Sequence, residues 1–231
     1  MELKKKKIYI AGDSTACIYP HFGENNQFPR TGWGQVIDRF LPEYTIVDLA
    51  LSGRSSKSFK TEDNYRYLQE NISTGDYLII QFGHNDSKEY DSSRYTSTNG
   101  SYQESLMEFV RLARKSGASP ILATSISRNR PADSSLEEYV DAVKALADKE
   151  AIPLIDLYQA TNEYINKAGT AASTELFMNI SKNDERFIND LRFGNSEYKN
   201  KYTFDNTHLN INGALFIAEI AAKMLHAVIF N

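Results

Sequence analysis

The stretch YIAGDSTACI (residues 9–18) joins a short apolar run to a small polar turn. Together with the preceding Ile8, its first residues have the β-branched and aromatic character of a buried strand. Glycine and three small polar residues, GDST at 12–15, end the run abruptly where the edge of a core is expected. We therefore predict a strand over residues 8–11, with Ser14 in the loop that follows it.

Similar apolar runs recur along the chain, at residues 45–51, 77–82, 120–124 and 152–157. Segments with helical spacing lie between them, at 33–41, 102–115 and 136–149, and a last helical stripe runs through residues 214–228. Strands that alternate with helices predict a parallel sheet with helices on both faces. We expect an α/β fold with five parallel strands. Residues 168–204 lack clean periodicity, with helical turns expected at 174–179 and around Phe187, and their role stays open.

Composition sets limits on the class of protein. The chain has 231 residues, of which 41% are apolar and 12% aromatic, enough to build a core. No repeat or Gly/Ser-rich linker divides it, so we expect a single domain over residues 1–231. The net charge of −4 and the pI near 5.6 argue against nucleic acid and anionic membranes as partners. The oligomeric state stays open.

Cysteine usage and the N-terminal residues bear on location. The lysine run at 4–7 precedes only about five apolar residues, whereas an export signal needs roughly 7–15. Cys17 is the only cysteine, which excludes an intramolecular disulfide and fits a reducing cytosol. We expect a cytoplasmic protein. A secreted form whose signal peptide has been removed stays open as an alternative. We expect no stretch near the roughly 20 apolar residues of a membrane-spanning helix.

The chemistry-bearing residues follow the expected strands. Ligands of open α/β sheets bind at the carboxyl ends of the strands, and there lie GDST (12–15), SGRSSK (52–57) and GHND (83–86). A serine becomes a nucleophile when a base takes its proton and a third group orients that base. DNTH (205–208) supplies a carboxylate and an imidazole three residues apart. We predict Ser14 as nucleophile, His208 as base and Asp205 as its orienting group.

Acyl transfer also needs donors for the oxyanion of the tetrahedral intermediate. The backbone N–H of Ser14, that of Gly53 and the side-chain amide of Asn85 are the expected donors. Each of these residues also has a plainer interpretation, as a helix cap or a turn residue. We favour catalysis because the residues occur together, each at the end of an expected element.

These blocks resemble those of the SGNH, or GDSL, hydrolase superfamily. In it, IYIAGDST, GWGQ, GRSSKSF, GDYLIIQFGHND and DNTHLNINGA are similar to the rhamnogalacturonan acetylesterase-like group. The resemblance implies a flavodoxin-like three-layer α/β/α fold and a deacetylase of pectin-derived sugars that needs no metal or other cofactor. It implies the same roles for Ser14, Asp205 and His208, and for Gly53 and Asn85 as oxyanion donors.

Other residues in the same loops are candidates for substrate binding or for support of the loops. Arg54 is a candidate to bind a sugar hydroxyl or uronate, or else it pairs with a local carboxylate. His84 is a candidate to contact substrate or to brace the oxyanion loop. Asp13 and Asp86 are expected to fix loop geometry. A metal site built from the histidines and aspartates of these loops is disfavoured, because no HExxH or Cys-rich spacing is present.

The substrate expected is an acetylated oligosaccharide of plant cell walls, most specifically one derived from rhamnogalacturonan. Residues 125–139 lack the His-Gly and Tyr-Pro pattern expected there for this activity, so the sugar stays open. One rival is an acyl hydrolase for another ester, such as acetylxylan, a lipid or a thioester. Others are a sugar-binding module without turnover and a flavodoxin-like receiver or nucleotide-binding protein, although a receiver has no use for DNTH.

Overall fold

The computed structural model describes residues 5–19, 30–129, 134–169, 173–178 and 205–230. The strands in these residues are β1 (Lys7–Gly12), β2 (Thr45–Asp48), β3 (Tyr77–Gln81), β4 (Ser119–Ala123) and β5 (Leu154–Ile155). The α-helices are α1 (Asp63–Asn71), α2 (Ser101–Lys115), α3 (Ser134–Lys149), α4 (Leu157–Ala168) and α8 (Ile211–Phe230). Short 3₁₀ turns are η1 (Gly34–Arg39), η2 (Ser58–Thr61) and η3 (Thr174–Leu176).

The strands form one parallel five-stranded sheet in the order β2-β1-β3-β4-β5. This confirms the predicted sheet, and its order is the flavodoxin-like one. The chain leaves β1 toward β2 on one side, whereas β3 pairs with β1 on the other. The loops after β1 and β3 therefore lie on either side of the point where the direction of winding reverses, the usual ligand site of such sheets.

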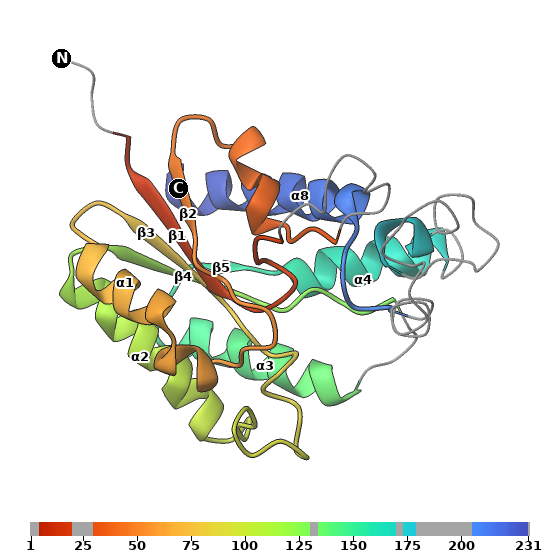
Figure 1. Ribbon diagram of the computed structural model, residues 1–231, viewed down its shortest axis with the longest axis horizontal. Helices are drawn as coiled ribbons and strands as arrows, with labels where there is room; N and C mark the ends of the chain where they lie inside the picture. Colours follow the sequence, from red (N-terminus) through yellow and green to blue (C-terminus); the bar gives the residue numbers. More distant parts are fainter. Residues whose placement is uncertain (1–4, 20–29, 130–133, 170–172, 179–204, 231) are drawn as a thin grey trace.

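Helices cover both faces of the sheet, and the period of two in the strands explains why (Figure 1). Ile8 and Ile10 of β1 pack in one core cluster with residues of η1, α4 and α8. Tyr9 and Ala11 pack in a second cluster with residues of α1, α2 and α3. All four side chains are fully buried. The expected three-layer α/β/α architecture is confirmed.

Some expected elements differ in detail. The helix expected at 33–41 is the 3₁₀ turn η1, because Pro42 disfavours helical geometry just before it and the turn is tied to the loop after β1. The segment expected to be a strand at 152–157 is shorter, because Asp156 caps α4 by accepting a hydrogen bond from the N–H of Gln159. The expected turns at 174–179 contain η3, and those around Phe187 lie outside the described residues.

Helix α8 corrects one expectation. Its 20 residues are long and apolar enough to cross a membrane by length and composition, contrary to the expectation that no such stretch exists. Its small-residue face nevertheless packs on the sheet: Ala214, Ala218, Ala221 and Leu225 are fully buried. This packing is that of the core helix of a layered α/β fold, and the same stretch was correctly predicted as a helix.

An unusual carboxyl lies at the end of β2. Asp48 Oδ1 accepts the N–H of Ala50 at 3.0 Å, but its buried Oδ2 has no hydrogen-bond partner. Burial raises the pKa of Asp48 to about 8, although the Ala50 N–H opposes the shift. A raised acid pKa means that the folded chain binds more protons than the unfolded one. Stability from this group is therefore lost as the pH rises from about 4 to about 8.

We expect Asp48→Asn to remove that loss. Between pH 5 and pH 8, the free energy of unfolding of the wild type should fall by on the order of 2 to 5 kcal/mol more than that of the variant. Urea unfolding at both pH values measures the difference. Because Asp86 also has a raised pKa, of about 6, the comparison between wild type and variant isolates Asp48. An equal slope in the two proteins contradicts the expectation.

Candidate active site

The turn after β1 is fixed by Asp13. Its Oδ1 accepts the backbone N–H of Thr15 at 2.9 Å and the Thr15 hydroxyl at 2.8 Å, and its Oδ2 lies 3.2 Å from His84 Nδ1. Burial raises the pKa of Asp13, but the charge and hydrogen bond of His84, with the Thr15 bonds, outweigh it and bring the pKa below its ordinary value. A buried carboxylate thus holds Ser14 in place.

The segment at 32–34, part of the GWGQ motif, supports the same turn from behind. The N–H groups of Trp33 and Gly34 donate to the carbonyls of Thr15 and Ala16 at 2.9 and 3.0 Å. A side chain on Gly32 would place its Cβ 2.2 Å from the Cys17 carbonyl oxygen. Glycine is required there because only a bare backbone can approach the turn this closely.

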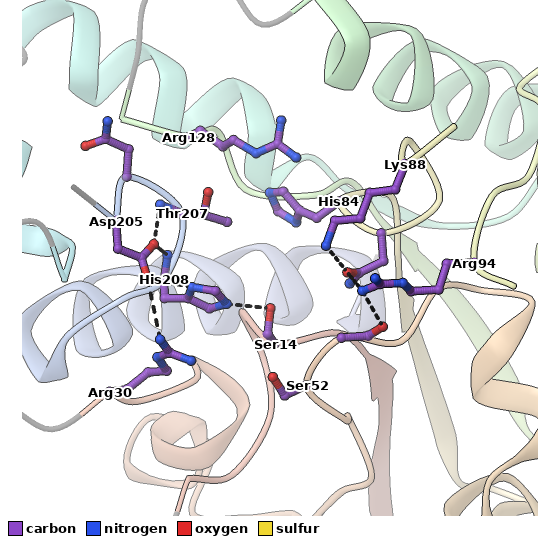
Figure 2. Close-up of a pocket in the computed structure, with 13 residues that line it drawn as sticks. Ser14, Arg30, Ser52, His84, Lys88, Arg94, Arg128, Asp205, Thr207 and His208 are labelled. Carbon is purple, nitrogen blue, oxygen red and sulfur yellow. Dashed lines mark hydrogen bonds and ion pairs between the residues drawn. The ribbon is translucent and has the colours of Figure 1, made fainter. Parts of the chain in front are cut away.

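The structure brings Ser14, His208 and Asp205 together, although the serine is 194 positions from the histidine (Figure 2). His208 Nε2 lies 3.0 Å from Ser14 Oγ, and His208 Nδ1 lies 2.7 Å from Asp205 Oδ2. The second oxygen, Asp205 Oδ1, accepts the backbone N–H groups of Thr207 and His208 at 3.1 and 2.9 Å. One short loop therefore orients both the carboxylate and the imidazole.

Asp205 is held as a carboxylate. Burial raises its pKa, but the hydrogen bond and charge of His208, together with the two backbone N–H groups, outweigh burial and lower it below the ordinary value. Arg30 Nη2 lies 3.5 Å from the same Oδ2, and the guanidinium stacks over the Tyr19 ring. A fixed negative charge beside Nδ1 places the imidazole proton there and leaves Nε2 as the acceptor that faces Ser14.

Contacts from distant segments hold this loop. The His208 carbonyl accepts the N–H of Met178 at 2.8 Å, and the Leu209 carbonyl accepts that of Thr31 at 3.1 Å. The next residue, Asn210, caps α8 by accepting the N–H groups of Asn212 and Gly213. The last helix and two segments from elsewhere in the chain thus fix the position of the imidazole.

The expected oxyanion donors lie in the same pocket. Ser14, Gly53 and Asn85 line one cavity, and Gly53 has a φ of +77°, which glycine adopts without strain. The backbone N–H groups of Ser14 and Gly53 make no hydrogen bond with the part of the chain that the structure describes. Asn85 Nδ2 donates one N–H to the Arg54 carbonyl at 3.0 Å. A side-chain amide has two N–H groups, so the second can donate to an oxyanion.

His84 and Arg54 are placed differently. His84 is 3% exposed, and its ring nitrogens contact Asp13 Oδ2 and the Ile126 carbonyl, at 3.2 and 3.1 Å. This geometry favours the bracing role over substrate contact. Arg54 does not line the cavity of Ser14: its Nε donates to Glu62 Oε1 at 2.6 Å, and its side chain lines a neighbouring cavity of about 600 Å³. The ion pair with Glu62 is the alternative that the sequence left open for Arg54, and its role in substrate binding stays a prediction.

The cavity of Ser14 measures about 660 Å³, and sequence reasoning missed most of its charge. Four cationic side chains line it: Arg30, Lys88, Arg94 and Arg128. Among the described residues of the lining, Asp205 is the only acidic one, and it contacts His208. The one available signal was that three of the cations lie in loops after β3 and β4, at the expected ligand edge. Among the described residues, no three His, Cys, Asp or Glu side chains group as a metal site.

Comparisons with known proteins agree with this geometry. The chain is 34% identical over 229 residues to rhamnogalacturonan acetylesterase RhgT of Bacillus subtilis (strain 168), across 96% of this chain and 90% of the relative. It is 32% identical over 221 residues to the probable rhamnogalacturonan acetylesterase YesY of the same organism, across 94% and 90% of the two chains.

Solved structures share the fold. The YxiM protein of Bacillus subtilis superposes with a TM-score of 0.74 at 23% identity, over 97% of this chain and 57% of that one. Axe2, an acetylxylan esterase of Geobacillus stearothermophilus, superposes with a TM-score of 0.66 at 18% identity, over 97% and 96%. The model of the GDSL-like lipase/acylhydrolase family matches residues 10–178, which is more than half of the chain. The resemblance drawn from the sequence motifs is confirmed: the chain belongs to the GDSL-like lipase/acylhydrolase family.

Proposed function

We propose that this chain is a serine carbohydrate esterase that removes acetyl groups from plant cell-wall oligosaccharides, most specifically those derived from rhamnogalacturonan. The observation that carries the proposal is the 3.0 Å contact between Ser14 Oγ and His208 Nε2, inside an open cavity of about 660 Å³. Family membership and the names of the two similar relatives support ester hydrolysis on this class of sugar.

In the proposed reaction, Ser14 Oγ attacks the acetyl carbonyl while His208 Nε2 takes its proton. The carbonyl oxygen becomes an oxyanion that the N–H groups of Ser14, Gly53 and Asn85 stabilise. The carbon–oxygen bond to the sugar then breaks, and His208 returns the proton to the departing hydroxyl. Water, deprotonated by the same imidazole, attacks the acetyl-serine and releases acetate. Asp205 stabilises the imidazolium in both halves.

The charge of the cavity supports an acidic sugar. The described residues that line it include four cationic side chains and one carboxylate, Asp205, which contacts both His208 and Arg30. A cleft lined by one sign of charge concentrates ligands of the opposite sign. Rhamnogalacturonan carries uronate carboxylates, whereas the xylan backbone is neutral. The charge pattern therefore favours rhamnogalacturonan over acetylxylan.

The test is acetate release from acetylated rhamnogalacturonan and acetylxylan fragments of matched acetyl content. We expect kcat/KM at least about 10-fold higher for the acidic substrate, corresponding to about 1.4 kcal/mol. Raising the salt from 50 to 500 mM should shrink this preference by screening, and should leave the hydrolysis of acetylxylan nearly constant. Faster turnover of acetylxylan contradicts the proposed sugar, and faster turnover of butyryl than acetyl esters contradicts a deacetylase.

We also propose that the protein acts in the cytoplasm on imported fragments. The support is its cysteine usage: the sequence has a single cysteine, Cys17, so it forms no intramolecular disulfide, which fits a reducing compartment. Fractionation of the source cells, with activity and antibody detection in each fraction, tests this location.

A further inference from the structure

The side-chain amide of Asn85 makes hydrogen bonds through both its nitrogen and its oxygen. Its Nδ2 donates to the Arg54 carbonyl at 3.0 Å. Its Oδ1 accepts Lys88 Nζ at 2.8 Å and lies 3.5 Å from Arg94 Nη1. Figure 2 labels both cations. The chemistry of the partners fixes the orientation, because the carbonyl only accepts hydrogen bonds and the two cations only donate them. Asn85 is 3% exposed, so this arrangement lies in surroundings where charges act strongly.

The loop after Asn85 anchors the second cation. Arg94 Nε and Nη2 each lie 2.6 Å from Asp91 Oδ2. The Ser93 hydroxyl and the Arg94 guanidinium lower the pKa of Asp91 to about 2, so the anchor stays charged. The free end of the guanidinium, Nη1, lies 3.5 Å from both the Gly53 carbonyl and Asn85 Oδ1. One side chain therefore bridges the two loops that carry expected oxyanion donors.

Cations that contact the oxygen of an amide change how strongly its N–H groups donate hydrogen bonds. A charge-assisted hydrogen bond to Oδ1 draws electron density toward the oxygen, which makes the N–H groups stronger donors. The same positive charges lie at the oxygen end of the amide, so they also oppose a flip that would bring its nitrogen toward them. Neither effect requires contact between a cation and the substrate.

We propose that Lys88 and Arg94 are positioning residues that orient and polarise the Asn85 amide, and so act on the transition state through it. This inference rests on the oxyanion role proposed for Asn85. It gives the loop of residues 87–97 a part in the chemistry, beyond any part in binding. The competing explanation is that the two cations only bind a carboxylate of the sugar.

A double-mutant cycle on p-nitrophenyl acetate separates the two explanations, because this substrate carries no carboxylate and no sugar. We expect Asn85→Ala to lower kcat by about 10²-fold and Lys88→Met by about 5- to 20-fold, each with little change in KM. In the Asn85→Ala background, Lys88→Met should cost less than about 2-fold, because the group through which it acts is gone.

Controls address folding and charge. Lys88→Arg keeps a cation and should retain at least about half of the wild-type kcat, a rescue that general damage to the loop would not allow. Lys57→Met is the matched control: Lys57 is exposed, its Nζ donates to the Ser92 carbonyl, and it does not line the cavity of Ser14. Melting temperatures of all variants confirm that the native state is compared.

Three outcomes overturn the inference. Equal losses from Lys88→Met in both backgrounds mean that Lys88 does not act through Asn85. If Lys88→Met leaves kcat on p-nitrophenyl acetate unchanged and raises KM only for acidic fragments, the cations serve substrate binding alone. Full activity of Asn85→Ala means that Asn85 is not an oxyanion donor. In these cases Ser14→Ala, measured alongside, stays inactive and the esterase proposal survives. If Ser14→Ala keeps its activity, the proposed function fails as well.

Discussion

Ser14→Ala is expected to lower kcat for p-nitrophenyl acetate by about 10⁴-fold or more, because no other group then forms the acyl-enzyme. The fold should survive the change. Ser14 is 6% exposed, and the turn is held by Asp13 and by the N–H groups of Trp33 and Gly34, none of which bonds the Ser14 hydroxyl. Steady-state rates with burst-phase detection of p-nitrophenol measure both turnover and the loss of the covalent intermediate.

A matched serine supplies the control. Ser119 begins β4 at the opposite edge of the sheet and is exposed, so Ser119→Ala makes the same chemical change far from the cavity. It should keep wild-type kcat. If Ser14→Ala retains more than about a tenth of the wild-type rate in a preparation free of contaminating esterase, Ser14 is not the nucleophile, and the mechanism built on it must be abandoned.

The central strands β1, β3 and β4 could be predicted because each buries both of its faces. Strands inside an α/β sheet read as continuous apolar runs, and the five runs of this chain became the five observed strands. Helix α1 was missed because Leu68 is its only buried residue, too little for an amphipathic stripe. Helix α4 was missed because its start overlaps the last apolar run, and only the cap at Asp156 marks the boundary.

The convergence of the polar loops could also be predicted, since the topology of a parallel sheet places its loops at one edge. Ser14 and Asn85 follow β1 and β3, whose adjacency in the observed sheet brings the two loops together. The loop of His208 is different. Its position depends on hydrogen bonds to Thr31 and Met178, which no local sequence pattern predicts. Only the chemical requirement for a base identified the histidine.

The cationic lining could not be predicted, because a long basic side chain can point to solvent or into a cleft without any change in the local pattern. Arg54 and Arg94 illustrate this. Arg54 directly follows an expected donor, yet it pairs with Glu62, whereas Arg94 lies in a polar loop and reaches Asn85 because Asp91 directs it. Nearby carboxylates decide where each guanidinium lies, and those pairings depend on tertiary structure.

Asp205→Asn should have the second largest effect, lowering kcat by about 10³- to 10⁴-fold with little change in KM. The carboxylate accepts the Nδ1 proton of His208 at 2.7 Å while its other oxygen accepts two backbone N–H groups. An asparagine that keeps its oxygen on those N–H groups must turn its NH₂ toward Nδ1. The imidazole then carries its proton on Nε2 and cannot accept the one from Ser14.

The asparagine variant tests orientation separately from loop structure. It preserves size and the backbone bonds, so the melting temperature should change little, whereas Asp205→Ala removes those bonds and should lower both kcat and stability. Asp63→Asn is the matched control, since Asp63 is an exposed carboxylate that pairs with Arg66 at the start of α1. A kcat for Asp205→Asn within about 3-fold of wild type would show that the carboxylate does not set the tautomer. The 2.7 Å contact would then be structural, and the imidazole would have to be oriented by the loop backbone alone.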